Sequence, residues 1–349
     1  MSWIIYGATG YTGRLVAAEA VRRGLRPTLA GRSRDAVSAM AAELGLEASV
    51  FGLDDASSIR DAIRGAQLVL HCAGPFSATA EPMISACLAE GVHYLDITGE
   101  IDVFAYAKSR EDAARRADVV LLPGVGFDVV PSDCLAASLV EALPAATQLQ
   151  LAFEATGGVS PGTAKTSIEG LGKGGCIRRD GRLETVPLAW KSRRIPLAHA
   201  ERTGVTIPWG DVFTAFESTG IPDIEVYIAL PESRIAWLRL LRWIRPLLRW
   251  GAVQAFLKSR VESSVSGPSE ESRKKSHCQL WGQATSADGR SVSATMSTPN
   301  GYDVTVSASL GIVEFLLGQS VEGGYYTPSL LVGSGYAATL PGVTFSLLT

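Results

Sequence analysis

The chain has 349 residues and a formal net charge of −3, with 46% hydrophobic and 19% charged residues. This length fits two domains, and the apolar content supplies a large core and excludes global disorder. The small net charge gives no reason to expect a nucleic-acid partner. The five cysteines are scattered and have no CxxC spacing, so they indicate neither metal ligands nor disulfides. We therefore expect a cytoplasmic protein with reduced cysteines.

The first turn of the chain has the spacing of a dinucleotide-binding loop. A short apolar strand at 2–6 precedes Gly7-Ala8-Thr9-Gly10-Tyr11-Thr12-Gly13, and a helix is predicted over 14–23. In such a unit the first glycine permits a tight turn, the second lets the backbone approach a pyrophosphate, and the third allows close helix packing. Backbone N–H groups and the helix dipole would then bind the phosphates. The alternative is a purely structural turn.

The loop after the second predicted strand, at 27–30, indicates which cofactor binds. Arg32 and Arg34 flank Ser33 there, and the first acidic residue is Asp35. Guanidinium groups match the 2′-phosphate of NADP, whereas NAD needs an acid that accepts the ribose hydroxyl. We therefore predict NADP in preference to NAD. In the alternative interpretation Ser33 only caps the next helix and the arginines face solvent.

Further strands alternate with helices in this region, which predicts a doubly wound parallel sheet of the Rossmann type. Asp54, after the third strand, is placed either to reach the adenine or to cap a helix. The loop Cys72-Ala73-Gly74-Pro75-Phe76 is expected to border the nicotinamide, because loops after the first and fourth strands flank the ligand crevice in such a sheet. The strands are predicted at 48–53, 67–71, 92–97 and 119–122.

Three segments resemble saccharopine dehydrogenase-like oxidoreductases. They are 73–76, Tyr94-Leu95-Asp96-Ile97-Thr98-Gly99-Glu100, and 124–133, and a weaker match recurs at 323–329. The resemblance is closest to the branch with trans-acting enoyl reductases and the eukaryotic saccharopine dehydrogenase-like oxidoreductase. It implies a Rossmann domain, a second α/β domain with the substrate face, and a nicotinamide cofactor. Phe127-Asp128-Val129-Val130-Pro131 replaces the Gly-Leu-Asp-Pro-Gly-like segment of saccharopine-forming enzymes, so the resemblance does not extend to saccharopine as substrate.

After residue 143 the pattern changes to short strands and hairpins. Turns at 179–182 and 287–290 predict antiparallel strand pairs, and a helix is predicted over 302–317. We therefore predict a Rossmann domain at 1–143 and a second α+β domain with a largely antiparallel sheet at 144–318. The C-terminal segment, 319–349, is expected to pack back on the first domain.

Two residues are candidate proton donors. Lys165 follows a Ser/Thr-rich loop at the start of a predicted helix, where it could meet an anionic or carbonyl group. Asp128 lies in the loop after the sixth strand. As alternatives, Asp128 caps a helix or fixes the loop, and Lys165 is solvated on the surface of its helix. The expected reaction is hydride transfer to a C=C (enoyl) or C=N (imine) bond of a small or lipid-like substrate.

The stretch 237–250 combines three tryptophans with arginines, and no acidic residue occurs between Glu232 and Glu262. Four arginines, Arg239, Arg242, Arg245 and Arg249, would lie on one face of a continuous helix. Residues 236–250 are therefore expected to contact an anionic membrane surface, to form a homodimer face, to cover an apolar substrate, or to pack with snorkelling arginines. A non-catalytic NADP-binding scaffold at the membrane, or a dimeric binding protein, remains as the alternative function. No leader peptide or membrane-spanning segment is expected.

Overall fold

The computed structural model describes residues 2–348, with the backbone alone described at 245, 246, 262 and 263. The chain divides into an N-terminal unit, Met1–Asp128 with Thr305–Pro328, and a second unit, Val129–Val304 with Ser329–Thr349. The division at 128 differs from the predicted one at 143 because helix α7 (Val130–Ala142) packs on strand β13 (His277–Ser286), where Leu135 and Leu139 lie over Gly282.

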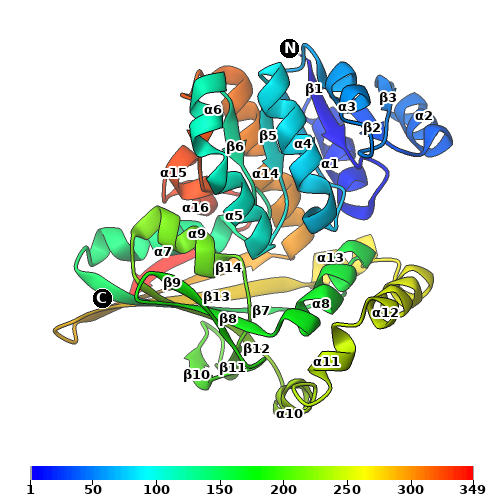
Figure 1. Ribbon diagram of the computed structural model, residues 1–349. Coiled ribbons are helices and arrows are strands. Elements are labelled where there is room, and N and C mark those ends of the chain that lie inside the picture. Colours follow the sequence, from blue (N-terminus) through cyan, green and yellow to red (C-terminus); the bar gives the residue numbers. More distant parts are fainter. Residues whose placement is uncertain (1, 349) are drawn as a thin grey trace. The chain divides into compact units, whose positions relative to one another are not determined.

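A seven-stranded parallel sheet forms the centre of the N-terminal unit (Figure 1). Its order is β15-β6-β5-β4-β1-β2-β3, so the strand order reverses between β1 and β4. This confirms the predicted doubly wound sheet and places its switch point where the glycine turn follows β1. The strands are β1 (Trp3–Tyr6), β2 (Thr28–Gly31), β3 (Ala48–Val50), β4 (Leu68–His71), β5 (His93–Asp96), β6 (Val120–Leu122) and β15 (Gly324–Tyr325).

The central strands are apolar on both faces because helices cover both sides of a doubly wound sheet. All four residues of β1 and all four of β4 are buried. The helical stretch 101–117 is divided at Arg110, which follows Ser109, the last residue of one helix, and is the N-cap residue of the next. The helices are α1 (Tyr11–Arg22), α2 (Arg34–Leu44), α3 (Ala56–Ile63), α4 (Phe76–Glu90), α5 (Ile101–Ser109), α6 (Glu111–Ala117) and α14 (Gly301–Gly318), of which α14 begins in the second unit.

The edge strand β15 lies in the segment that follows α14, where the sequence pattern predicts no strand. Gly324 and Tyr325 pair in parallel with Val120 and Leu121 of β6. Gly323 fits against α6 only because it lacks a side chain, since a Cβ there would lie 2.6 Å from the Ala114 carbonyl oxygen. Two residues are too few to give a strand pattern, so only the tertiary contact reveals this strand.

The second unit contains a sheet in the order β10-β11-β12-β7-β13-β14-β16, with β8 pairing to β12 and to β9. Among the pairs described, all are antiparallel except β12 with β7. The predicted largely antiparallel sheet and both predicted hairpins are confirmed. The strands are β7 (Ala146–Ala155), β8 (Gly175–Arg179), β9 (Arg182–Val186), β10 (Ser192–Pro196), β11 (Glu201–Thr206), β12 (Asp223–Ala229), β13, β14 (Ser291–Pro299) and β16 (Thr344–Leu348).

The C-terminal segment is shared between the two units rather than packed on the first domain alone. Residues up to Pro328 belong to the N-terminal unit, whereas β16 pairs with β14 of the second unit, Phe345 opposite Met296. The helices of the second unit are α7, α8 (Pro161–Lys173), α9 (Asp211–Thr219), α10 (Glu232–Leu240), α11 (Arg245–Leu248), α12 (Gly251–Ser264), α13 (Glu270–Lys275), α15 (Pro328–Val332), which begins at the boundary, and α16 (Tyr336–Thr339).

The tryptophan-rich stretch 237–250 is not the continuous helix that its arginine spacing predicts. It comprises the end of α10, a turn at 241–244, α11, and Trp250 in an extended conformation before α12. Pro246 has no N–H group with which to continue the hydrogen-bond pattern of α10, so the helix ends before it. Arg242 turns inward and donates hydrogen bonds to the carbonyl oxygens of Leu188 and Ala189. The proposed stripe of four arginines is therefore wrong, and the Arg245 side chain lies outside those described.

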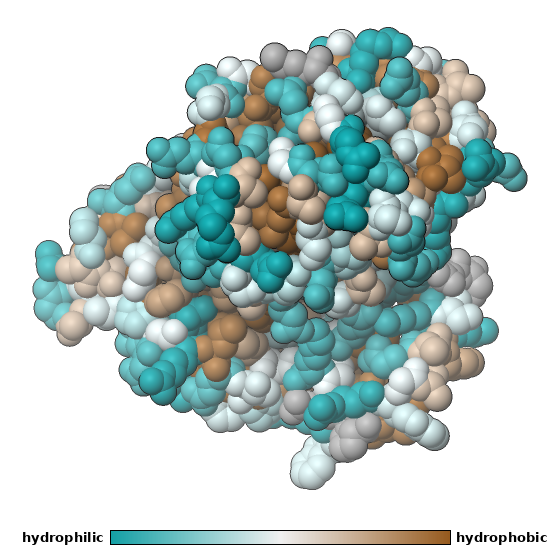
Figure 2. All heavy atoms as spheres, turned by 45° about the horizontal axis from the view of Figure 1, so that its top comes forward, coloured by the Kyte–Doolittle hydropathy of each residue, from teal (hydrophilic) through white to brown (hydrophobic). Residues whose placement is uncertain are grey.

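Hydrophilic side chains are spread over the face drawn in Figure 2, with hydrophobic ones in small patches between them. Within the described chain, no helix has both the length and the apolar character needed to span a lipid bilayer. The five cysteines are all free thiols.

Candidate functional site

The glycine turn between β1 and α1 is packed too closely for side chains at two of its three glycines. Gly7 adopts a φ of +78°, and a Cβ there would lie 2.7 Å from the Cβ of Ala73. A Cβ on Gly13 would lie 2.3 Å from the Gly7 carbonyl oxygen. The N–H groups of Gly7 and Ala8 both donate to the Ala30 carbonyl oxygen of β2, at 2.9 and 3.1 Å. These contacts hold the turn against β2 and the loop after β4.

Gly10 differs from the other two glycines because it is exposed and only one atom lies near the position of a Cβ. Its backbone is extended, and a Cβ there would meet the Gly7 carbonyl oxygen at 3.2 Å. Packing therefore constrains Gly10 less than Gly7 or Gly13, and an exposed main chain without a side chain is what close approach of a phosphate would require.

The start of α1 has the features of an anion-binding helix terminus. Its N-cap residue is Gly10, which has no side chain with which to cap the helix, and its first turn contains no acidic residue. By contrast, Asp55 caps α3 and Ser160 caps α8 with their own side-chain oxygens. A helix that begins at a glycine, with no acid in its first turn, keeps the positive end of its dipole, which favours a phosphate.

The residues predicted to select the cofactor lie on the exposed loop after β2. Arg32, Ser33 and Arg34 are exposed, and neither arginine forms an ion pair with a carboxylate in the described part of the chain. Ser33 is the N-cap residue of α2, but its side chain makes no capping hydrogen bond. Burial raises the pKa of Tyr6, while the charge of Arg32 opposes this shift. Arg32 thus lies within electrostatic reach of the end of β1.

Asp54 is exposed, and the helix cap proposed for it is provided by its neighbour. The Asp55 carboxylate accepts the N–H groups of Ser57 and Ser58 at 3.1 and 3.2 Å, and hydrogen bonds lower its pKa to about 2. The charge of Asp54 contributes to the raised pKa of Tyr6. Asp54 and Arg32 therefore lie around the same tyrosine, at the end of the site predicted for the adenosine.

The loop after β4 is held beside the glycine turn by hydrogen bonds. The Cys72 N–H donates to the Tyr6 carbonyl oxygen at 2.8 Å, and the Thr79 hydroxyl donates to the Ala73 carbonyl oxygen at 2.7 Å. Because that hydroxyl uses its proton on Ala73, the contact of 3.0 Å to His71 Nε2 requires a proton on His71. Burial lowers the pKa of His71 to about 3, so the ring is neutral, as expected for a structural histidine.

The five residues predicted to border the nicotinamide, 72–76, form the loop after β4 and the start of α4, and Ala73 lies against Gly7 of the glycine turn. Cys72, Ala73 and Pro75 are half-buried, Gly74 is exposed, and Phe76 is buried as the first residue of α4. Burial raises the pKa of the Cys72 thiol to about 12, which excludes a thiolate nucleophile at neutral pH.

Glu100 is a residue of the site that the sequence analysis did not assign. It is 8% exposed, and its carboxylate accepts the backbone N–H groups of Phe76 at 2.9 Å and Ser77 at 2.8 Å. Helix α4 begins at Phe76 because an acid from another strand loop caps its first turn. Glu100 and Phe76 are far apart in the chain, so the sequence contains no local signal for this cap.

Asp96 ties the ends of β5 and β6 together. Its carboxylate accepts hydrogen bonds from the Tyr94 hydroxyl at 2.7 Å and from the N–H groups of Thr98 and Gly124 at 2.9 Å each. Burial raises its pKa to about 7 despite these hydrogen bonds, and the charge of Glu100 adds to the shift. Asp96 is completely buried and therefore organises the loops rather than contacting a ligand.

Asp128 lies beside this carboxylate network and is half-buried. A Cβ on Gly99 would lie 2.9 Å from its Oδ2, so the acid packs directly on the segment that carries Glu100. Burial, followed by the charge of Glu100, raises the pKa of Asp128 to about 7. Its neighbour Phe127 donates its N–H to the Thr305 hydroxyl at 3.0 Å, which fixes the loop. A carboxyl group with this pKa can act as a proton donor near neutral pH.

Lys165 belongs to the second unit and lies in the first half of α8. Ser160 caps this helix by accepting the Thr163 N–H at 3.2 Å, and the Tyr302 hydroxyl accepts the Ser160 N–H. Lys165 is half-buried, so it is not the fully solvated lysine of the default interpretation. The two predicted proton donors thus lie in different units of the chain.

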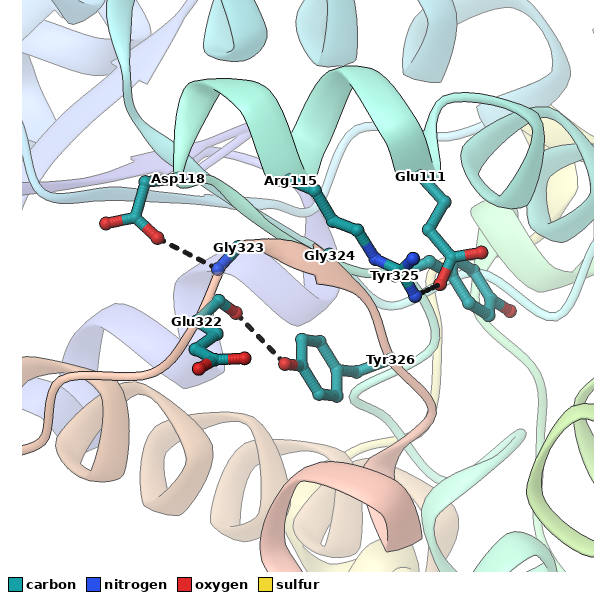
Figure 3. A pocket seen from close by; sticks show the side chains of 8 residues that line it. All are labelled: Glu111, Arg115, Asp118, Glu322, Gly323, Gly324, Tyr325 and Tyr326. Carbon is teal, nitrogen blue, oxygen red and sulfur yellow. Dashed lines mark hydrogen bonds and ion pairs between the residues drawn. The ribbon is translucent and has the colours of Figure 1, made fainter.

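A separate polar pocket is lined by α6 and the β15 segment (Figure 3). Arg115 donates to Glu111 at 2.7 Å, and the Gly323 N–H donates to Asp118 at 2.9 Å. The pocket adjoins the beginning of β6, whereas the glycine turn and Asp128 follow the ends of strands. The pocket is lined by three acidic side chains, Glu111, Asp118 and Glu322, and by one arginine. This excess of negative charge disfavours a phosphate ligand.

Comparison with known proteins agrees with the nucleotide-binding geometry. Residues 3–122, from the first residue of β1 to the last of β6, match the family model described as the saccharopine dehydrogenase NADP binding domain. A trans-acting enoyl reductase of Mycobacterium tuberculosis is 33% identical over 142 residues, covering 37% of this chain and 33% of the relative. The human saccharopine dehydrogenase-like oxidoreductase is 27% identical over 239 residues, covering 59% of this chain and 56% of the relative.

The matched part of this chain therefore spans only a third of the mycobacterial relative and just over half of the human one. Among solved structures, apo saccharopine dehydrogenase (L-Glu forming) from Saccharomyces cerevisiae aligns with a TM-score of 0.68 over 100% of both chains at 11% identity. At this identity the likeness concerns the fold, which is the two-domain α/β fold described above.

Proposed function

Because the chain belongs to the saccharopine dehydrogenase-like family, we propose that it is an NADP-dependent oxidoreductase that transfers hydride to a C=C or C=N bond. The observation that carries this proposal is the glycine turn between β1 and α1, with an exposed glycine as the N-cap residue of α1 and no acidic residue in the first turn of that helix. NADPH, when bound, would supply the hydride. The names of the relatives are consistent with a reductase, and an enoyl compound is the substrate class that the mycobacterial relative suggests.

The residues of the N-terminal unit are grouped by the part of the cofactor that each is expected to contact. The backbone of 7–13 would hold the pyrophosphate, and Arg32 with Arg34 would bind the 2′-phosphate. Ser33 and Asp54 would complete the adenosine side. The loop 72–76 would border the nicotinamide, because it is packed against Gly7 and follows β4 at the switch point of the sheet.

Titration of cofactor fluorescence tests the phosphate contact. Replacing Arg32 with Ala should weaken NADPH binding by about tenfold or more and NADH binding by less than about twofold, since only NADPH carries the 2′-phosphate. Arg116→Ala is the matched control because Arg116 is an exposed arginine of α6. Equal losses for both cofactors would remove Arg32 from the phosphate site, and absence of binding of either cofactor by the wild type would refute the proposal.

Asp128 is the proposed proton donor for the reduced bond. After hydride addition, its carboxyl proton would pass to the α-carbon of an enoyl substrate or to the nitrogen of an imine, which leaves the carboxylate for reprotonation from water. Activity should therefore fall as pH rises through about 7, where Asp128 loses its proton. Lys165 is the competing donor from the second unit.

Variants of Asp128 and Lys165 distinguish between these two candidate proton donors once a substrate is found. NADPH oxidation should be followed with an enoyl thioester and with a cyclic imine, each at a series of pH values. Asp128→Asn should lower kcat about a hundredfold and abolish the loss of rate above pH 7, with NADPH affinity retained. If only Lys165→Gln has this effect, the lysine is the donor. Tight NADPH binding with turnover of neither substrate would favour the alternative function, a non-catalytic NADP-binding scaffold or a dimeric binding protein.

A further inference from the structure

The helices α10, α11 and α12 of the second unit expose a concentration of large apolar side chains. Tryptophan is rarely left accessible in a folded protein, yet three tryptophans here expose well over half of their surface. The exposed fractions are 64% for Trp237, 84% for Trp243 and 65% for Trp250, and Leu240, Ile244, Leu247 and Phe256 are also exposed. We call these seven side chains the tryptophan patch.

Other side chains attach this segment to the rest of the unit. Ile235 is buried in a cluster with Ala189 and Val205, and Leu238 packs against the same cluster. Leu248 is buried at the other end of the segment. The tryptophan patch is therefore additional to the residues that hold the helices in place, and its exposure is not explained by the stability of the fold.

Polar contacts also fix the segment from its inner side. Arg242 donates to backbone carbonyl oxygens of the β9–β10 connection, and Gln254 Nε2 donates to the Leu248 carbonyl oxygen at 2.6 Å. Lys258 forms an ion pair with Glu169 of α8. These contacts orient α10 and α12 so that the apolar side chains of the patch remain on the outside.

Cationic groups accompany the patch. Arg239 and Arg249 are exposed among its apolar residues, and the sequence has no acidic residue from 233 to 261. The whole chain carries a net charge of −3, so this local excess of positive charge is a property of the segment and not of the protein. Exposed tryptophan and leucine with flanking arginine is the composition of a surface that lies in the headgroup region of a bilayer.

We infer that the tryptophan patch docks on an anionic lipid bilayer. The tryptophan rings would lie at the boundary of headgroups and acyl chains, and Arg239 with Arg249 would contact lipid phosphates. A second copy of the chain is a less favourable occupant. A twofold interface would place this patch against itself, so that the arginines of the two copies would repel each other without an acidic residue of this segment between them. This inference is independent of the proposed reaction, since none of these residues lies in the N-terminal unit.

Vesicle flotation of the full chain tests the inference. We expect the protein to float with vesicles of equal parts phosphatidylcholine and phosphatidylglycerol, and to float less with phosphatidylcholine alone or at high salt. Replacing Arg239 with Gln should reduce partitioning to the anionic vesicles by about fivefold, the contribution expected for one basic residue near the surface. Equal binding to both kinds of vesicle, or to neither, would overturn the inference.

A matched pair of leucine variants separates the patch from a general effect of charge. Leu240 lies in the patch and is 62% exposed, whereas Leu183 lies on β9 and is 40% exposed. Leu240→Glu should reduce flotation at least about tenfold, and Leu183→Glu, which adds the same charge, should not. Both must keep the thermal midpoint and NADPH affinity of the wild type, which distinguishes this test from the test of the reaction. A dimer that Leu240→Glu dissociates, without vesicle binding by the wild type, would identify a second copy as the occupant and refute the lipid surface.

Discussion

The Glu100 carboxylate caps a helix that begins 24 residues earlier, accepting the Phe76 N–H at 2.9 Å. Because Asp128 packs on Gly99, the loops after β4, β5 and β6 form one connected group of contacts at the ends of the strands. This connection links the candidate proton donor to the loop expected at the nicotinamide.

Removing the Glu100 cap should destabilise the N-terminal unit. Glu100→Ala leaves two backbone N–H groups at the start of α4 without their acceptor, and we expect a loss of about 1 to 2 kcal/mol in the free energy of unfolding. Urea denaturation measures this loss. Glu43→Ala, an exposed position of α2, is the control and should change stability by less than about 0.5 kcal/mol. A Glu100 variant as stable as the control would mean that the cap contributes nothing.

Two glycines of the same turn should respond differently to substitution by alanine. Gly13→Ala places a Cβ 2.3 Å from the Gly7 carbonyl oxygen and should lower stability by about 2 kcal/mol or more. Gly10→Ala meets the same oxygen at 3.2 Å, which a small shift relieves, and should lower stability far less than Gly13→Ala does. It should nevertheless weaken NADPH binding by about tenfold, because its methyl group occupies the space where the ligand approaches. If Gly10→Ala binds NADPH as the wild type does, the phosphates do not contact this turn.

The Thr79 hydroxyl should control the shape of the loop after β4. Thr79→Val removes the hydrogen bonds to the Ala73 carbonyl oxygen and to His71, at a cost of about 1 kcal/mol, and should weaken cofactor binding through the displaced loop. Thr79→Ser keeps the hydroxyl and should restore both properties. Calorimetric unfolding and NADPH titration of the two variants measure the effects. Failure of serine to rescue would assign the role to the threonine methyl group instead.

The buried Asp96 should make stability depend on pH. Its pKa in the folded protein is about 7, above the value of about 4 for an unfolded aspartate, so the folded state binds the extra proton between these values. The free energy of unfolding should therefore decrease as pH rises from about 4 to about 7, by up to about 4 kcal/mol for this group. Urea denaturation at pH 5 and pH 7.5 measures the decrease.

Asp96→Asn cannot titrate and should lose most of this pH dependence, although Asp128, whose pKa is also raised to about 7, retains a part. An unchanged dependence in the Asp96 variant would mean that other groups cause it. An increase in stability with pH over the same range would contradict the raised pKa itself.

Local patterns in the sequence predicted those parts of the protein that depend on neighbouring residues. The glycine turn and the two hairpins at 179–182 and 287–290 are formed by residues close in the chain, and they are present. The alternation of strands and helices predicted the parallel sheet for the same reason. Arg32 and Arg34 were singled out from their position after β2, and the structure places both on an exposed loop, where their role in binding the cofactor remains a prediction.

Other features were decided by contacts between distant segments. Helix α7 begins with Val130 and Pro131, directly after the loop that carries Asp128, and its packing on β13 assigns it to the second unit. Strand β15 has two residues and exists through its pairing with β6. Arg242 points inward and donates to the Leu188 carbonyl oxygen, so the four arginines do not lie on the one helix face that was predicted.

The sequence by itself determined the fold class and the position of the nucleotide loop, because helix and strand periodicity and glycine spacing act over a few residues. Only the tertiary structure decided that Glu100 caps α4, that packing constrains Gly13 more tightly than Gly10, and which tryptophans remain exposed. The reason is physical: burial, close packing and the pKa of a carboxyl group depend on atoms brought together from separate parts of the chain, and no short pattern contains that information.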